Sequence, residues 1–237
     1  MPKTTAKSVS RNTLSVKPSY GLFSARFYEQ IRRVRFVSYA VIKRFLDFTL
    51  SLILIVVFSP TLIIIAAIVK IDSPGPVLFK QERVGKNGRI FKILKFRSMV
   101  SDNNVRDTSC EDKYTKVGKA LRRFSLDELP QLFNVLVGQM SFVGPRPWIL
   151  EYWTNMNTEE RERAKVLPGI TGLAQVKGRN GISIFQKIEY DLIYVKHYSL
   201  WQDIKIIIMT VGTVLFGEDV DAGKEGVMDD IQDLRRG

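Results

Sequence analysis

The stretch that decides the fold runs from Phe48 to Val69 and reads FTLSLILIVVFSPTLIIIAAIV. Its 22 residues carry no charge, and a helix of about 20 apolar residues is long enough to cross the hydrocarbon layer of a bilayer. The sequence therefore predicts a helix inserted in a membrane. The alternative is a buried helix in a soluble protein, although core helices of this length seldom lack polar residues all round.

Basic residues flank this segment on both sides. Those before it are Arg26, Arg32, Arg33, Arg35, Lys43 and Arg44, and those after it are Lys70, Lys80, Arg83, Lys86, Arg89, Lys92, Lys95 and Arg97. Because Lys and Arg favour the cytoplasmic side, neither flank is expected to cross. Pro60 removes a backbone donor, and Ser59 can bond to a freed carbonyl. We therefore expect a re-entrant helix that breaks at Ser59-Pro60 and returns to the cytoplasmic face, with a kinked spanning helix as the alternative.

Composition divides the rest of the chain into segments around this helix. Residues 1–24 are rich in Ser, Thr and Lys and predict a flexible tail. Residues 25–43 predict a basic amphipathic helix on the membrane surface. The expected re-entrant helix covers 44–70, a cytoplasmic catalytic domain 71–200, an interfacial helix 201–217 and a C-terminal tail 218–237. For the helix at 201–217, burial in the protein core is an equally open alternative.

The charge of the whole chain predicts a phosphate-bearing partner. The 237 residues include 36 Lys+Arg and 24 Asp+Glu, a formal net charge of +12, which attracts nucleotides, lipid headgroups or nucleic acid. The basic residues gather beside the apolar segment and no helix-turn-helix or RNP pattern occurs, so we expect no nucleic-acid partner. A single Cys110 and a single His197 exclude an internal disulfide and a Cys/His zinc site.

The segment after the membrane helix predicts a small β component. Residues 77–79 and 90–96 have the composition of two short strands, and Gly85-Lys86-Asn87-Gly88 forms the turn between them. A polar loop with Cys110 follows over 100–114, and then a helical pattern over 117–123. The predicted fold class is thus mainly α with a small β-hairpin component, in a monotopic membrane protein with a re-entrant helix and interfacial amphipathic helices.

The residues with the clearest chemical potential lie in Ser125-Leu126-Asp127-Glu128-Leu129-Pro130. Proline is tolerated in the first turn of a helix, so a helix is expected to begin close to Asp127. In a structural interpretation, Ser125 and Glu128 form a capping box and Asp127 complements the helix dipole.

In a functional interpretation, Asp127 follows Arg122 and Arg123 by about one turn, where phosphate groups collect. An aspartate there can attack phosphorus and carry a phosphoryl group. The adjacent Glu128 could hold a divalent cation on a diphosphate, and hard oxygen ligands indicate Mg²⁺. Downstream, two prolines fix Arg146 in Gly144-Pro145-Arg146-Pro147 as a rigid phosphate clamp, although Pro-rich turns are also common without a function.

From about Lys43 to Phe216 the chain resembles the bacterial sugar transferases, the monotopic phosphoglycosyl transferases. The blocks that carry the resemblance stand in the family's order, and they are Lys43-Arg44-x-x-Asp47, Ser59-Pro60, Lys95-Phe96-Arg97-Ser98-Met99, Arg122-x-x-Ser125 to Leu132, Met140 to Pro147 and Pro168-Gly169-Ile170-Thr171-Gly172. The resemblance implies transfer of a sugar 1-phosphate from a UDP-sugar to polyprenyl (undecaprenyl) phosphate with release of UMP. It places this reaction at the cytoplasmic face of the bacterial inner membrane, as the first membrane step of surface glycan or glycoprotein glycan synthesis.

The resemblance also implies roles for individual residues. Asp127 is the expected nucleophile of a ping-pong mechanism, with Glu128 assisting through Mg²⁺ or proton handling, so both are candidate metal ligands. Lys95, Arg122, Arg146 and Arg179 are the expected nucleotide or phosphate contacts. We further hypothesise that Lys43 or Arg44 pairs with Asp191 to fix the angle of the membrane helix.

The sugar, the assembly and the partners are less determined. Similar small family members often use UDP-linked N-acetylated amino sugars, which makes these the leading donors, with UDP-glucose or UDP-galactose as alternatives. The expected partners are a UDP-sugar, polyprenyl phosphate and membrane lipids, and the oligomeric state stays open, a homo-oligomer included. A membrane-anchored adaptor without catalysis is the alternative from another class, but it would leave the setting of Asp127 and Glu128 unexplained.

Overall fold

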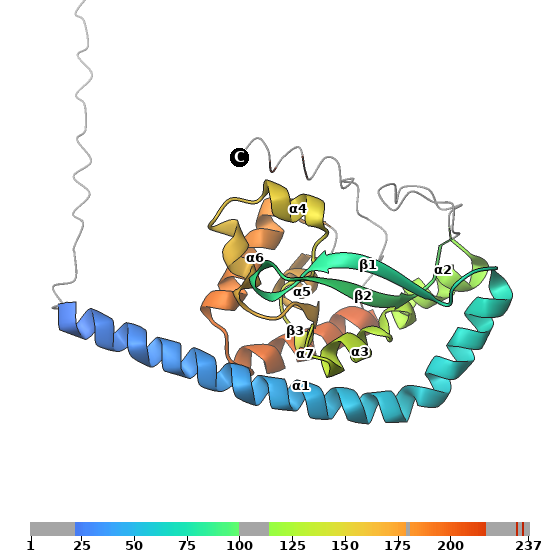
Figure 1. Ribbon diagram of the computed structural model, residues 1–237, viewed down its shortest axis with the longest axis horizontal. Helices are drawn as coiled ribbons and strands as arrows, with labels where there is room; N and C mark the ends of the chain where they lie inside the picture. The colour runs from blue at the N-terminus through green and yellow to red at the C-terminus, as the bar shows by residue number, and fades with distance from the viewer. Residues whose placement is uncertain (1–21, 100–113, 179–180, 217–230, 232–233, 235–237) are drawn as a thin grey trace, which may run out of the picture. The chain divides into compact units, whose positions relative to one another are not determined.

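The computed structural model describes residues 22–99, 114–178 and 181–216, together with Ile231 and Leu234. Most of the predicted N-terminal tail, the polar loop with Cys110, Arg179 and the rest of the predicted C-terminal tail lie outside the described residues. The chain divides into two compact units, 1–37 and 38–237, and the second contains all the described strands. This unit is mostly helical with two small sheets (Figure 1), which confirms the predicted fold class in outline.

Helix α1 (Leu22–Asp72) is 51 residues long and has Pro60 inside it. The predicted surface helix at 25–43 and the predicted membrane helix at 44–70 are thus parts of one helix. Ser59 Oγ donates to the carbonyl oxygen of Val56 at 2.7 Å, as expected of a serine beside a proline. Figure 1 shows that the second half of α1 is bent, so the expected break at Ser59-Pro60 is replaced by a bend without interruption.

The apolar part of α1 is exposed. Residues Val34–Asp72 are long and apolar enough to cross a membrane, and only 11% of their most apolar window is buried inside the protein. The most exposed side chains, at 58–86%, include Val56, Val57, Ile63, Ile64 and Ile71. A helix in the core of a soluble protein would have these side chains covered, so their exposure favours a lipid environment over the core-helix alternative.

A buried polar cluster joins α1 to helix α7 (Leu200–Phe216). Lys43 forms a buried ion pair with Asp203 of α7, and Tyr39 donates from its hydroxyl to the same carboxylate at 2.5 Å. The hypothesis that Lys43 or Arg44 pairs with Asp191 is therefore wrong. Asp191, on α6 (Ile184–Lys196), instead accepts two hydrogen bonds from Arg163 at 3.0 and 2.6 Å.

Two further side chains of α1 hold the elements around the candidate site. Arg44 donates to the carbonyl oxygens of Val135 and Leu136, both at 2.6 Å, and so caps the C-terminal end of α3 (Gln131–Leu136). Asp47 accepts a hydrogen bond from the Phe142 amide at 3.2 Å, on strand β3 (Ser141–Val143). The Lys43-Arg44-x-x-Asp47 block is therefore a structural joint between α1 and the domain that follows it.

The predicted hairpin is present. Strand β1 (Leu78–Val84) pairs antiparallel with β2 (Ile90–Phe96), in a register that runs from Leu78 opposite Phe96 to Val84 opposite Ile90. The turn is a short 3₁₀ helix, η1 (Lys86–Gly88), with positive φ at Asn87 and Gly88. The first strand is longer than predicted because polar residues continue the pairing beyond Phe79.

A second sheet, which the sequence analysis did not predict, joins two of the glycine-containing blocks. Strand β3 pairs in parallel with β4 (Gly169–Thr171). The backbones approach so closely that a Cβ on Gly144 would lie 2.3 Å from the Leu167 carbonyl oxygen, and a Cβ on Gly169 would lie 2.1 Å from the Gly144 nitrogen. Only glycine fits at these two positions, which explains why glycine occupies both.

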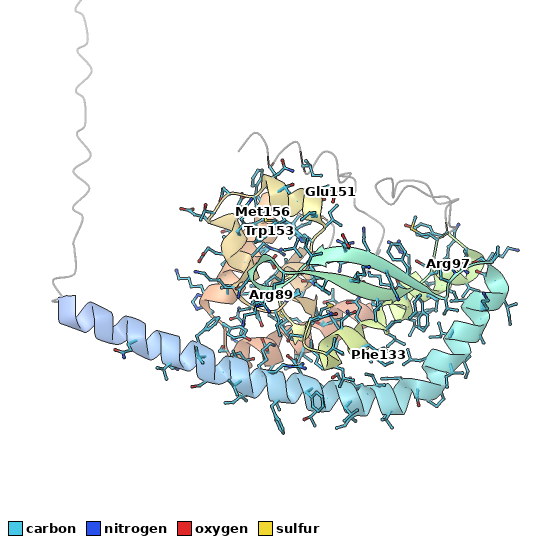
Figure 2. All side chains as sticks on the ribbon, in the orientation of Figure 1. Arg89, Arg97, Phe133, Glu151, Trp153 and Met156 are labelled. Carbon is cyan, nitrogen blue, oxygen red and sulfur yellow. The ribbon has the colours of Figure 1, made fainter. Side chains whose placement is uncertain are left out.

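The remaining elements are α2 (Lys116–Arg123), η3 (Leu126–Glu128), α4 (Leu150–Asn155), η4 (Glu160–Lys165), α5 (Leu173–Gly178) and the helices α6 and α7. Buried apolar side chains of the described residues form three clusters. One cluster packs Ile65 and Val69 of α1 against Phe96 and Leu121. Arg97 closes the same region by donating to the carbonyl oxygens of Ser73 and Pro74 just beyond α1, at 2.6 and 2.8 Å (Figure 2).

Helix α7 has one face in the core and one face exposed. Asp203 and Ile206 are buried, whereas its exposed apolar side chains include Leu200, Trp201, Ile204, Ile207, Ile208 and Val211. The buried face agrees with the core alternative for this helix. The exposed apolar face is the kind of surface that the interfacial alternative requires. Asp203 lies on the buried face, where its carboxylate neutralises Lys43.

Candidate active site

Asp127 and Glu128 lie on the short 3₁₀ helix η3, directly before α3. Pro130 is the N-cap of α3, so the α-helix begins at Gln131 and a single 3₁₀ turn occupies the predicted start near Asp127. Ser125 has a left-handed backbone, with φ of 55°, and its side chain makes no capping hydrogen bond. The capping-box interpretation is therefore wrong, which leaves both carboxylates available for other contacts.

Asn134 holds this turn against the hairpin. It is buried on α3, accepts a hydrogen bond from the Leu94 amide at 3.0 Å and donates to the Lys92 carbonyl oxygen at 2.9 Å. Its amide therefore pairs with the edge of β2 that β1 leaves open, next to Lys95 on the same strand. Sequence reasoning missed Asn134 because a lone asparagine in a short helix has no motif around it.

Glu128 is the centre of an ion cluster. Lys95 Nζ lies 2.5 Å from Glu128 Oε1, and Arg146 Nη2 lies 3.8 Å from the same oxygen. Burial opposes ionisation of Glu128, but Lys95 and Arg146 outweigh it and hold the pKa of this carboxyl below its usual range. Glu128 is thus a carboxylate in the free protein, and three residues predicted from distant parts of the sequence meet at one point.

Asp127 is in a different electrostatic setting from its neighbour. Its side chain is 7% exposed, and burial raises its pKa, with Glu128 adding to the effect while Lys95 and Arg122 oppose it. Two adjacent carboxylates with pKa values pushed apart by their surroundings are a frequent arrangement at catalytic sites. The raised pKa makes the Asp127 carboxylate the more basic of the two.

A small cleft opens beside Glu128. The residues that line it are Arg83, Ile93, Lys95, Glu128, Gln131, Arg146, Pro147, Gly169 and Ile170. Three of them carry positive charge against a single carboxylate, so the lining has a net positive charge and suits an anionic ligand such as a phosphate.

Arg83 is a cleft residue that sequence reasoning did not select. Its guanidinium donates to Gln81 Oε1 at 2.5 Å and to the Pro147 carbonyl oxygen at 3.3 Å, and among the described residues its buried Nε has no partner. Burial, and next the charge of Arg146, lower the pKa of Arg83 to about 10. It therefore stays charged at neutral pH and has an unused donor for an anion. It was one of many basic residues flanking the apolar segment, and only the fold distinguishes it.

The loop that carries Arg146 is held by its backbone. Gly169 N–H donates to the Pro145 carbonyl oxygen at 3.0 Å, and Val84 N–H donates to the Trp148 carbonyl oxygen at 2.9 Å. Between these two, Arg163 donates to the carbonyl oxygen of Arg146 itself at 2.7 Å. The predicted rigid mount is therefore present, although its rigidity comes from hydrogen bonds to three other segments as well as from the two prolines.

The remaining predicted residues lie at the edge of the site or beyond it. Arg122, at the end of α2, influences Asp127 electrostatically, and its guanidinium stacks 4.7 Å from the ring centroid of Tyr114. Arg179 lies outside the described residues. Among these residues no group of three or more His, Cys, Asp or Glu side chains is placed to hold a metal ion.

The chain belongs to the bacterial sugar transferase family, whose description "Bacterial sugar transferase" it matches over residues 38–217. This match covers both sheets, the Asp127–Glu128 turn and the Arg146 loop. It begins at the boundary of the second compact unit and ends just beyond α7.

Three relatives illustrate the similarity. The chain is 46% identical over 183 residues to UDP-glucose:undecaprenyl-phosphate glucose-1-phosphate transferase of Klebsiella pneumoniae, covering 72% of this chain and 39% of that protein. It is 43% identical over 192 residues to UDP-N-acetylgalactosamine-undecaprenyl-phosphate N-acetylgalactosaminephosphotransferase of Aeromonas hydrophila, covering 76% and 45%. It is 40% identical over 182 residues to the uncharacterized sugar transferase EpsL of Bacillus subtilis (strain 168), covering 76% and 90%. The chain thus spans less than half of the first two relatives and most of the third.

Proposed function

We propose that this protein transfers a sugar 1-phosphate from a UDP-sugar to polyprenyl phosphate and releases UMP. The observation that carries the proposal is the buried carboxylate of Asp127 beside Glu128, whose own charge is balanced by Lys95 and Arg146 at a cationic cleft. The names of two relatives, which transfer glucose 1-phosphate or N-acetylgalactosamine phosphate to undecaprenyl phosphate, support the same reaction.

In the first half-reaction, a carboxylate oxygen of Asp127 attacks the phosphorus atom that bears the sugar. A phosphorus–oxygen bond to the aspartate forms, the bond to the bridging oxygen breaks, and UMP leaves with that bonding pair. Lys95, Arg122 and Arg146 bind phosphate oxygens and stabilise the charge of the transition state. Arg83 adds a further cation to this set.

In the second half-reaction, a phosphate oxygen of polyprenyl phosphate attacks the same phosphorus atom. The bond to Asp127 breaks, the carboxylate is regenerated, and the sugar leaves as a diphosphate-linked lipid. Each half-reaction exchanges one phosphate ester or anhydride bond for another, so no net proton is required. Because UMP leaves before the lipid reacts, ping-pong kinetics are expected.

The carboxylates of Asp127 and Glu128 fit a magnesium ion that is also bound by substrate. Mg²⁺ is usually held in proteins by one or two carboxylates together with phosphate oxygens and water. The two adjacent carboxylates, without a third acidic side chain grouped with them among the described residues, match that pattern. When bound there, Mg²⁺ would neutralise the diphosphate and stabilise the leaving phosphate.

The exposed apolar faces support a membrane location for this reaction. Those of α1 and α7 belong to one compact unit with the site, and basic residues flank the apolar stretch on both sides. We infer that α1 enters the bacterial inner membrane as a re-entrant helix bent near Ser59-Pro60, and that the site faces the cytoplasm, where UDP-sugars are found.

The donor sugar is proposed as an N-acetylated amino sugar, with UDP-glucose and UDP-galactose as the alternatives. The test is UMP release by the purified full-length protein with polyprenyl phosphate and a panel of UDP-sugars, in Mg²⁺ and in EDTA. We expect release with one donor class, its loss in EDTA, and a hexosyl phosphate adduct on Asp127 when the lipid is omitted.

The control for this experiment is a pair of substitutions. Asp127→Asn should abolish both UMP release and the adduct, whereas Glu162→Gln, at a side chain that is 45% exposed on η4, should leave both unchanged. UMP release that survives in Asp127→Asn would refute the assignment of the nucleophile.

A further inference from the structure

Two residues beyond the family match are buried in the core. The match ends at residue 217, yet Ile231 and Leu234 are each only 7% exposed. Both positions are helical and three residues apart, which places them on one face of a helical turn. An apolar side chain on an unattached C-terminal tail would be exposed, so these two mark a point where the predicted tail 218–237 is docked.

Their partners form the apolar cluster between α4 and α6. The buried members are Trp148, Tyr152, Met156, Ile184, Ile188, Ile231 and Leu234. Figure 2 labels Trp153 of α4 and Met156, the C-cap of α4, and Trp153 packs on the edge of the cluster. Without Ile231 and Leu234, this cluster would be partly open to water, because two of its seven buried side chains come from the C-terminal segment.

The charge of the C-terminal segment favours docking on the protein over binding to a membrane. Residues 217–237 contain seven acidic and three basic residues, in a chain whose net charge is +12. An acidic segment is repelled by anionic lipid headgroups and attracted by a basic protein surface. The segment that packs against Trp148, Tyr152 and Ile184 is therefore the chain's own C-terminal segment.

The cluster supports the loop that carries Arg146. Trp148 ends this loop, and the guanidinium of Arg163 lies 4.1 Å from the centroid of the Trp148 ring. Arg163 also donates to the Arg146 carbonyl oxygen at 2.7 Å and forms a buried ion pair with Asp191 at 2.6 Å. The Arg146 side chain is 50% exposed, so its position depends on its backbone more than on side-chain packing.

We propose that the segment bearing Ile231 and Leu234 is an intramolecular clasp that positions Arg146. By completing the cluster under Trp148, the clasp keeps Arg163 against the Arg146 carbonyl, and Arg146 beside Glu128. The docking itself stands on the burial of the two side chains. Its effect on the donor half-reaction rests on the proposed function, in which Arg146 binds donor phosphate.

The test uses the full-length chain with Ile231→Ser and Leu234→Ser combined. The matched control is Ile90→Ser, because Ile90 is an apolar side chain that is 53% exposed at the start of β2. In a ping-pong mechanism, kcat/KM for the UDP-sugar reports the first half-reaction and kcat/KM for polyprenyl phosphate reports the second. We expect the double variant to lose about tenfold in the donor kcat/KM, to change less than about twofold in the acceptor kcat/KM, and to have a lower Tm than the control.

The outcomes separate the clasp from its alternatives. A double variant equal to Ile90→Ser in Tm and in donor kcat/KM would overturn the docking. A lower Tm with equal losses in both kcat/KM values would overturn the positioning role and leave only a contribution to stability. If the double variant does not fold, Ile231→Val with Leu234→Met gives the milder comparison and should retain wild-type kinetics, while the single variant Leu234→Ala should show the donor-specific loss in part.

Failure of the proposed function gives a different result. In that case the wild-type chain releases no UMP from any donor, while the difference in Tm between the double variant and Ile90→Ser still reports whether the clasp is docked.

Discussion

Replacing Asn134 tests most directly how the turn that carries Asp127 and Glu128 is held in place. Its side chain is 2% exposed and makes three hydrogen bonds, with the Leu94 amide, the Lys92 carbonyl and the Gln139 side chain. Asn134→Ala removes all three. It also leaves the Leu94 N–H and the Lys92 C=O without the partner that the edge of β2 has in the wild-type protein.

The expected loss of stability follows from these two backbone groups. A buried donor or acceptor left unpaired costs about 1–3 kcal/mol, so two of them should lower the free energy of unfolding by about 2–6 kcal/mol. For a protein of this size, 1 kcal/mol shifts Tm by about 2–4 °C. The Tm of Asn134→Ala should therefore fall by roughly 4–24 °C.

The assay is thermal unfolding in detergent, followed by tryptophan fluorescence, together with UMP release. Gln139→Ala is the matched control, because Gln139 is exposed and its side chain makes just one of the three bonds, at 2.7 Å. The control should lose no more than about 4 °C and keep its activity. A Tm of Asn134→Ala within about 2 °C of the control, with UMP release unchanged, would refute the view that Asn134 ties the turn to β2.

Three other substitutions give expectations of known sign. Burial raises the pKa of Asp127, so its ionisation opposes folding at neutral pH. Asp127→Asn should therefore raise Tm at pH 7. This gain should vanish below about pH 4, where the carboxyl is protonated in both the folded and the unfolded protein. Arg122 lowers the pKa of Asp127, so Arg122→Gln should move the acid limb of the pH–rate profile for the donor half-reaction to higher pH. Lys43→Met leaves the buried Asp203 carboxylate without a counter-charge and should cost about 3–5 kcal/mol of stability. Asp203→Asn should restore most of this loss in the double variant, and equal Tm values for the single and double variants would contradict the ion pair.

The parts of the fold that could be predicted are those that depend on local pattern. The turn at Gly85–Gly88 between two apolar runs predicted the hairpin, and the uninterrupted apolar stretch around Pro60 predicted a long helix, which is present with exposed apolar side chains. The break at Ser59-Pro60 was overestimated, because a proline removes one backbone hydrogen bond and the Ser59 hydroxyl occupies a nearby carbonyl.

The parts that could not be predicted depend on contacts between distant residues. Two aspartates in the C-terminal part of the chain, Asp191 and Asp203, could each pair with Lys43. Nothing in the sequence indicates that Asp191 pairs with Arg163, and that Lys43 therefore pairs with Asp203. Strands β3 and β4 are only three residues long each and have no alternation to identify them.

For the candidate site, the chemistry of single residues could be anticipated but their surroundings could not. Lys95, Glu128 and Arg146 do meet at one oxygen. Arg83 and Asn134 were missed because their roles come from the edge of β2 and the shape of the cleft. The left-handed backbone of Ser125 also made a plausible capping box wrong.

The close approach of Gly144 and Gly169 limits how this scaffold can be re-engineered. Even alanine at either position would place a carbon atom within 2.3 Å of the neighbouring backbone and force β3 and β4 apart. Mutant libraries aimed at a new donor sugar should keep both glycines fixed and vary cleft side chains such as Gln131 and Ile170. A library that also randomises Gly144 and Gly169 would consist largely of chains in which the cleft does not form.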